Sequence, residues 1–193
     1  YNECGIIWRV SILHACVLGC VFAALGQAGF WFYNEVGFET ALAKGASSVL
    51  SVLNFGLPGQ LAYTASTLFL EALNRPGPGL AIMVAANFVN FGLNWILIQG
   101  EFTLGAEGAA WATTISRWLI AGAAVIYILR MKDAHKFNIA GRLDAWRNTS
   151  NKLRGLGYPL GLAQGLESAA FASLTIFAGH ISVQAAAAFQ IVM

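Results

Sequence analysis

The stretch PGPGLAIMVAANFVNFGLNWILIQG (residues 76–100) contains no Asp, Glu, Lys or Arg. Roughly 25 residues in a helix that rises ~1.5 Å per residue reach about 37 Å, which exceeds the ~30 Å hydrocarbon core of a bilayer. Pro76 can open such a helix, because the N–H group that it lacks would have no partner in the first turn. The stretch therefore predicts a transmembrane helix.

Comparable runs fill most of the chain. Residues 10–34 and 45–70 are also uncharged, residues 108–129 and 155–179 carry one charge each, and a further run begins at Ile181. Of the 193 residues, 58% are hydrophobic and 10% are charged, whereas soluble domains average ~25% charged. The composition predicts an all-α polytopic membrane protein.

The positions of the basic residues predict how the spans are oriented in the membrane and where the chain divides into two lobes. Residues 130–154 include seven basic and two acidic side chains, so the positive-inside rule places this segment in the cytoplasm. We expect residues 1–129 to form four transmembrane helices of an N-terminal lobe, residues 130–154 to form a basic cytoplasmic loop between lobes, and residues 155–193 to begin a C-terminal lobe with one helix and part of the next. Because the chain starts at Tyr1 and its last span stops at Met193, we also expect a part of a longer protein.

Several classes of function lack support in the sequence. The three cysteines and three histidines form no CxxC or HxxxH pattern, which disfavours a metal or disulfide framework. Neither a phosphate-binding glycine loop nor a serine nucleophile motif is present. The net charge of +2 comes without a basic, aromatic-lined groove for nucleic acid. We expect no enzyme activity, no cofactor and no nucleic-acid partner.

Polar side chains recur inside the spans at helical spacing. Asn87, Asn90 and Asn94 line one face of the span at residues 76–100, and such a face must meet protein or water instead of lipid. Two neighbouring spans have similar stripes, formed by Gln60, Thr64, Thr67 and Glu71 and by Thr113, Ser116 and Arg117. The alternative is that these groups only hydrogen-bond adjacent helices, a contact worth about 0.6–2 kcal/mol.

Three charged residues within or near the spans need partners. Glu71 lies four residues before Arg75, a spacing that suits an ion pair. Arg117 lies too deep for full snorkelling, so we expect it to pair with an internal carboxylate. Glu167 is about twelve residues from either end of its span, where an ionised carboxylate costs ~2.5 kcal/mol or more. It is therefore a candidate to bind a proton or cation, the alternative being a neutral, hydrogen-bonded Glu.

Three stretches resemble the multidrug and toxin extrusion (MATE) cation antiporters, in their bacterial NorM-like branch. Residues 69–100 are similar to the hairpin of the fourth and fifth helices, residues 104–119 to the start of the sixth, and residues 156–191 to the seventh helix and the beginning of the eighth. The resemblance implies a MATE-like bundle of twelve helices in two lobes, of which this chain covers about helices 3 to 8.

The resemblance also implies roles for individual residues. Glu167 matches the carboxylate that binds the coupling cation or proton in the second lobe, and Asn90, Asn94 and Thr113 match the cation site of the first. Asn94 stands where some relatives have Asp, and Phe189 replaces the usual His before Gln190. Candidate substrate-cavity residues are Asn87, Glu71, Gln164, Gln190 and Arg117. The only metal ion expected is Na⁺, as a coupling ion.

The function that follows is secondary multidrug efflux across the bacterial inner membrane. H⁺ or Na⁺ would exchange for amphipathic, mostly cationic drugs by alternating access, without an obligate protein partner. One alternative is a lipid-linked saccharide flippase of the same superfamily, which would need cationic side chains such as Arg117. Another is a non-transporting membrane scaffold, in which the polar stripes only hold helices together.

Overall fold

The computed structural model describes residues 2–28, 40–99, 104–139 and 146–181. The chain divides into two compact units, Tyr1–Trp146 and Arg147–Met193, and each is described by itself. Every regular element in these ranges is helical. The predicted all-α class is thus confirmed.

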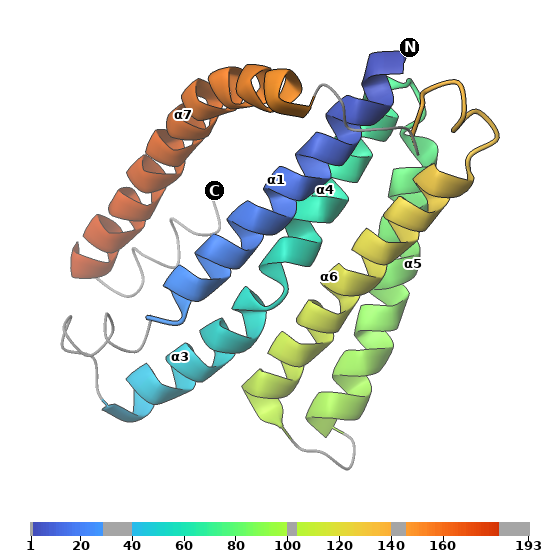
Figure 1. Cartoon of the computed structure of the whole chain (residues 1–193). Helices are drawn as coiled ribbons and strands as arrows, with labels where there is room; N and C mark the ends of the chain where they lie inside the picture. Colours follow the sequence, from blue (N-terminus) through green and yellow to red (C-terminus); the bar gives the residue numbers. More distant parts are fainter. Residues whose placement is uncertain (1, 29–39, 100–103, 140–145, 182–193) are drawn as a thin grey trace. The chain divides into compact units, whose positions relative to one another are not determined.

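The elements follow one another as a series of helices (Figure 1). They are α1 (Asn2–Gly26), α3 (Thr40–Asn54), α4 (Leu57–Ala72), α5 (Gly77–Asn94), the π-helical turn η1 (Trp95–Gln99), α6 (Gly105–Arg130) and α7 (Trp146–Ile181). Three stretches, Glu3–Gly26, Gly77–Ile98 and Gly105–Arg130, are long and apolar enough to cross a membrane. A π-helical turn extends α5, so the uncharged run at residues 76–100 is helical over nearly its whole length.

The run at residues 45–70 is broken, although its composition predicts one continuous span. Helix α3 ends at Asn54 and α4 begins at Leu57. Pro58 cannot donate a hydrogen bond to the carbonyl of Asn54, and its ring would collide with that carbonyl in a continuous helix. Instead the Gly56 N–H donates to the Leu53 carbonyl at 3.0 Å and forms a turn. The helical hydrogen bonds of α4 then begin with the Gln60 N–H, which donates to the Gly56 carbonyl at 2.9 Å.

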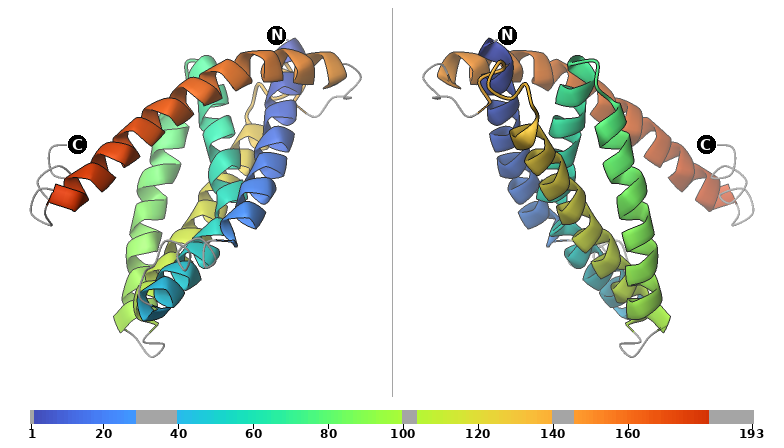
Figure 2. Two further views of the ribbon diagram at one scale, coloured as in Figure 1. Left: turned by 90° about the vertical axis from the view of Figure 1, so that its left-hand side faces the viewer. Right: turned by 90° about the vertical axis from the view of Figure 1, so that its right-hand side faces the viewer.

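The first unit is a bundle organised around α4 and α6. Helix α4 packs against α1 and α6, and α6 also packs against α3 and α5, as the two side views in Figure 2 show. Helix α5 and the turn η1 expose large apolar side chains, including Phe88 and Phe91 of α5 and Trp95 of η1. Outward apolar side chains suit a helix that faces lipid, so the exposure pattern agrees with a membrane protein.

An apolar cluster closes the end of the bundle where α1 begins and α4 and α6 end. Its buried members are Trp8, Leu70, Ile128, Met131 and Ile139. The last two belong to the segment 131–139, which folds back against α1. There the Gly5 N–H donates to the carbonyl of Phe137 at 3.0 Å. A side chain on Gly5 would collide with that carbonyl, so this close approach requires glycine.

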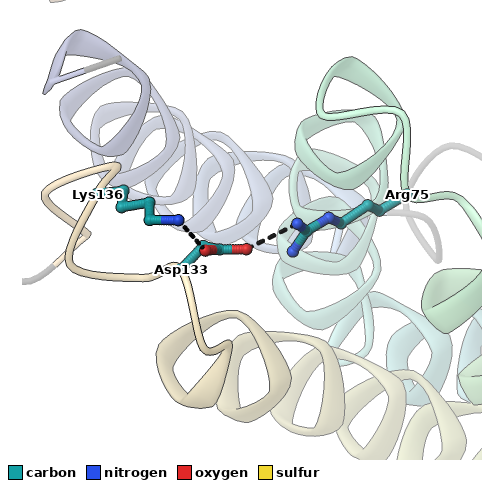
Figure 3. A network of polar contacts seen from close by, with 3 residues as sticks. All are labelled: Arg75, Asp133 and Lys136. Carbon is teal, nitrogen blue, oxygen red and sulfur yellow. Dashed lines mark hydrogen bonds and ion pairs between the residues drawn. The ribbon is translucent and has the colours of Figure 1, made fainter.

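The same end carries an ionic network on its surface (Figure 3). Asp133 accepts from the Arg75 guanidinium at 2.7 Å and from the Lys136 ammonium at 2.8 Å. The hydrogen bond from Lys136, followed by that from Arg75, lowers the pKa of Asp133 to about 2. Arg75, in the turn between α4 and α5, thus pairs with a residue that follows α6 instead of with Glu71 at the end of α4.

Helix α7 begins inside the segment expected to be a loop. Residues 146–154 are helical, although their basic and polar character predicts a cytoplasmic connection. Exposed Arg, Asn and Lys side chains are compatible with a helix, and the Arg154 guanidinium donates to the side-chain oxygen Oδ1 of Asn151 at 2.6 Å, one turn away. In the described part of the inter-lobe segment, residues 131–139 lie outside the helices and residues 146–154 are helical. Helix α7 continues through Pro159.

Candidate functional site

Members of the polar stripes of α4, α5 and α6 meet at one pocket, although Thr64, Thr67 and Glu71 of the α4 stripe do not line it. Its volume is about 260 Å³. Polar and charged side chains make up most of its wall, with three apolar residues between them. The lining residues are Gln60 and Tyr63 from α4, Met83, Ala86, Asn87 and Asn90 from α5, and Thr113, Ser116, Arg117 and Ile120 from α6. Three separate helices thus supply polar side chains to one open pocket of the first unit.

Two of the predicted coupling residues are bonded to each other beside this pocket. The Asn94 amide donates to the Asn90 side-chain oxygen at 2.9 Å and to the Asn90 backbone carbonyl at 3.0 Å. The Asn90 amide in turn donates to the Ser116 hydroxyl at 3.2 Å. Asn90 is therefore the link between α5 and α6, and Asn94 lies one turn further along α5, outside the pocket wall.

Thr113 lies in the same pocket wall as Asn90. Its hydroxyl donates to the Ala109 carbonyl in its own helix at 2.9 Å, which leaves the hydroxyl oxygen able to accept a proton donor or to contact a cation. The amide oxygens and this hydroxyl are oxygen ligands of the kind that hard cations prefer. The pocket thus brings together two of the three residues predicted for the first cation site.

Arg117 has a backbone partner where the sequence predicts a carboxylate. Its guanidinium donates to the Leu53 carbonyl at 3.2 Å, next to the break between α3 and α4. On the same side of α6, Thr114 donates to the Val52 carbonyl at 2.8 Å and Trp118 donates to the Phe55 carbonyl at 2.9 Å. The last carbonyls of a helix lack intrahelical partners, and these three side chains supply donors to carbonyls around the break.

The remaining candidates lie elsewhere. Glu71 is exposed near the end of α4 and is not part of the pocket wall. Gln164 and Glu167 belong to α7 in the second unit, where the Gln164 amide donates to a Glu167 carboxylate oxygen at 3.2 Å. Gln190 lies outside the described residues.

Comparison of the sequence with those of known proteins shows its family. The chain is 36% identical over its whole length to "Probable multidrug resistance protein NorM" of Caulobacter vibrioides, and it covers 42% of that protein. Proteins of the same description from Acinetobacter baylyi and Bacillus licheniformis are 29% and 26% identical over 97% and 92% of the chain. The chain belongs to the NorM-like branch of the MATE family.

The NorM-like chain spans less than half the length of these relatives, since it covers 41–43% of each. No family model and no solved structure matches it. Its relatives are named as multidrug resistance proteins, and the apolar helices agree with a membrane location.

Among the residues that the structure describes, no three His, Cys, Asp or Glu side chains gather as metal ligands. The pocket wall that this NorM-like chain supplies offers amide and hydroxyl oxygens as possible cation ligands. Sequence reasoning missed Tyr63, which lies buried in the pocket wall and donates to the Gly79 carbonyl at 2.9 Å. Its spacing of three from Gln60 is the signal that could have identified it.

Proposed function

We propose that the parent protein of this chain is a secondary multidrug antiporter of the bacterial inner membrane. It exchanges H⁺ or Na⁺ for amphipathic, mostly cationic drugs by alternating access. The observation that carries this proposal is the meeting of Gln60 of α4, Asn87 and Asn90 of α5, and the polar stripe of α6 at one pocket. The names of the relatives add support for drugs as the transported solutes.

In this proposal, Asn90, Asn94 and Thr113 hold the coupling ion in the first lobe. The Asn90 side-chain oxygen already accepts a bond from Asn94, so a Na⁺ ion at that oxygen competes with the Asn94 amide. Rotation of Asn94 would free the oxygen and turn its own amide oxygen toward the ion. Cation binding thereby changes the link between α5 and α6 that Asn90 makes through Ser116.

Glu167 is the proposed acidic member of the coupling machinery. Its carboxylate lies within one turn of the Gln164 amide, which donates to it and holds it in one orientation. A carboxylate in a membrane span stabilises itself by taking up a proton or a cation. In this proposal, uptake of a proton or cation at Glu167 is coupled to release of the drug.

Transport by the full-length parent in proteoliposomes tests the first-lobe roles. We expect Asn90→Ala to reduce gradient-driven efflux of a fluorescent organic cation by at least about tenfold, because the variant loses an ion-binding oxygen and the bond to Ser116. Asn151→Ala is the matched control, since it removes the same side chain at an exposed position of α7 that does not line the pocket. Efflux that is equal in all three proteins would contradict the assignment.

A lipid-linked saccharide flippase is the second candidate, because Arg117 places a cation in the pocket wall. It predicts that a lipid-linked substrate competes with drug for the protein. The scaffold alternative predicts that Asn90→Ala and Asn94→Ala lower stability and leave efflux unchanged relative to the amount of folded protein. The transport assay, normalised to folded protein, separates these outcomes.

A further inference from the structure

One buried amide at the break between α3 and α4 has no hydrogen-bond partner. It belongs to Asn54, the last residue of α3, which is 5% exposed. In the part of the chain that the structure describes, its side-chain nitrogen is buried and donates to no acceptor. A buried donor without a partner raises the free energy of the conformation that holds it. Segments of the parent outside this chain reach the nitrogen only if the helices that cover it move.

The amide lies against the end of α1. A Cβ added at Gly26 would collide with the side-chain nitrogen and oxygen of Asn54, so glycine at this position lets the amide approach the α1 backbone. The last carbonyls of a helix lack intrahelical partners, and a carbonyl oxygen can accept two hydrogen bonds. The end of α1 therefore offers acceptors close to the unpaired amide.

The start of α4 is fixed between two helices. Gly19 of α1 lies close to Pro58, and Gly59 of α4 lies close to the backbone of Arg117 on α6. A Cβ on either glycine would be in tight contact with the neighbouring helix. Because close-packed backbones leave little room for movement, we expect α4 to keep its place in the bundle if the break bends.

Helix α3 is held at its end by side-chain hydrogen bonds. Thr114 and Arg117 of α6 donate to carbonyls in its last turn at 2.8 and 3.2 Å. Gln27, directly after α1, donates to the Ser51 carbonyl at 3.3 Å. A side chain changes its acceptor by rotating, without the unwinding of a helix. Helix α3 is therefore the arm that can move at the break.

We propose that the break is a hinge on which α3 moves between two positions, and that Asn54 favours the second one. In the described position, donors from α6 hold the end of α3 and the Asn54 amide has no partner. In the second position, this amide donates to a carbonyl in the last turn of α1, and Thr114 and Arg117 release α3. The inference rests on the proposed alternating access and supplies it with a two-state element inside the first lobe.

Hydrogen exchange of the full-length parent in nanodiscs, without an ion gradient, tests the hinge. We expect movement of α3 to open the turn bond from the Gly56 N–H to the Leu53 carbonyl, so backbone exchange at the break reports the second position. Asn54→Leu keeps the branching of the side chain and removes the donor. We expect it to slow this exchange about two- to tenfold, the effect of one hydrogen bond. Exchange as fast as in the wild type, or faster, would overturn the proposal.

Thr114→Val is the matched control for the opposite direction. It removes a bond that holds α3 in the described position, so exchange at the break should become faster than in the wild type. Slower exchange in this variant would contradict the assignment of the two positions. Asn54→Ala removes the same donor without a branched side chain. If Asn54→Leu does not fold, the exchange rate of Asn54→Ala is compared instead, with the same criteria.

Thermal melting gives a second test of the unpaired amide. An apolar side chain in place of an unpaired donor removes its cost, so Asn54→Leu should melt at a temperature no lower than the wild type. If the amide already has a partner in the resting protein, Asn54→Ala and Asn54→Leu both melt at a lower temperature, and the proposal fails.

Efflux then distinguishes the hinge from the proposed antiport. Where the wild type shows gradient-driven efflux, we expect Asn54→Leu to lower its rate about two- to tenfold, because the second position loses one hydrogen bond. Undiminished efflux would show that transport does not use the hinge and would overturn the proposal. If the wild type shows no gradient-driven efflux, the antiport fails, whereas the exchange rates at the break still decide whether the hinge exists.

Discussion

The break between α3 and α4 predicts that adjacent threonines on α6 differ in their contribution to stability. Thr114 is 3% exposed, and its hydroxyl donates to the Val52 carbonyl of α3 at 2.8 Å. Thr114→Val keeps the volume of the side chain and removes this donor. The Val52 carbonyl then lies buried with one partner fewer, so we expect a loss of about 1–2 kcal/mol in the free energy of unfolding.

Thr113→Val is the matched control. The Thr113 hydroxyl donates to the Ala109 carbonyl of its own helix, a carbonyl that can also accept the backbone N–H one turn later. We expect this variant to lose less than about 0.5 kcal/mol. Reversible unfolding of the full-length parent in mixed micelles measures both variants. The reasoning is refuted if Thr114→Val is no less stable than Thr113→Val.

Two further predictions concern the end of the bundle closed by segment 131–139. Gly5→Ala places a Cβ against the Phe137 carbonyl, so we expect it to lower the free energy of unfolding by about 1–3 kcal/mol in the same unfolding assay; wild-type stability would show that the segment moves freely. The pKa of Asp133 is lowered to about 2, mainly by the hydrogen bond from Lys136 and then by that from Arg75. The ionised Asp133 therefore stabilises the folded protein fully above the pKa of the unfolded chain, near ~3.9, and this stabilisation is lost as pH falls through about 2. Between about pH 5 and pH 2 we expect the melting temperature in detergent to fall less for Asp133→Asn than for the wild type, because the variant has no carboxylate to protonate. Identical curves of melting temperature against pH for the two proteins would show that the ionic network does not contribute to stability.

Much of the fold is predictable from the sequence, because bilayer thickness sets the length of an uncharged run. The runs at residues 76–100 and 108–129 correspond to α5 with η1 and to α6. The helical spacing of the asparagines also predicts a shared polar face, and Asn87 and Asn90 do line the same pocket. Which stripes meet in space depends on how the helices pack, and spacing within a single helix carries no such information.

The features that the sequence did not reveal depend on backbone hydrogen bonds. Residues 45–70 are uncharged throughout, and only Gly56 and Pro58 mark the place where the helix stops and restarts. Arg117 was expected to need a carboxylate because of its charge, but the break supplies the Leu53 carbonyl as a partner. A carbonyl without a helical partner can be recognised only once the break itself is known.

Efflux driven by an imposed gradient, compared between the wild-type full-length parent and Glu167→Gln, tests the proposed antiport most directly. Proteoliposomes loaded with a fluorescent organic cation would receive a proton gradient and, separately, a sodium gradient. We expect one gradient to drive efflux by the wild type, and we expect Glu167→Gln to abolish that efflux because the amide cannot take up a proton or hold a cation as the carboxylate does. Undiminished efflux in Glu167→Gln, with equal amounts of folded protein, would contradict the central role of this carboxylate.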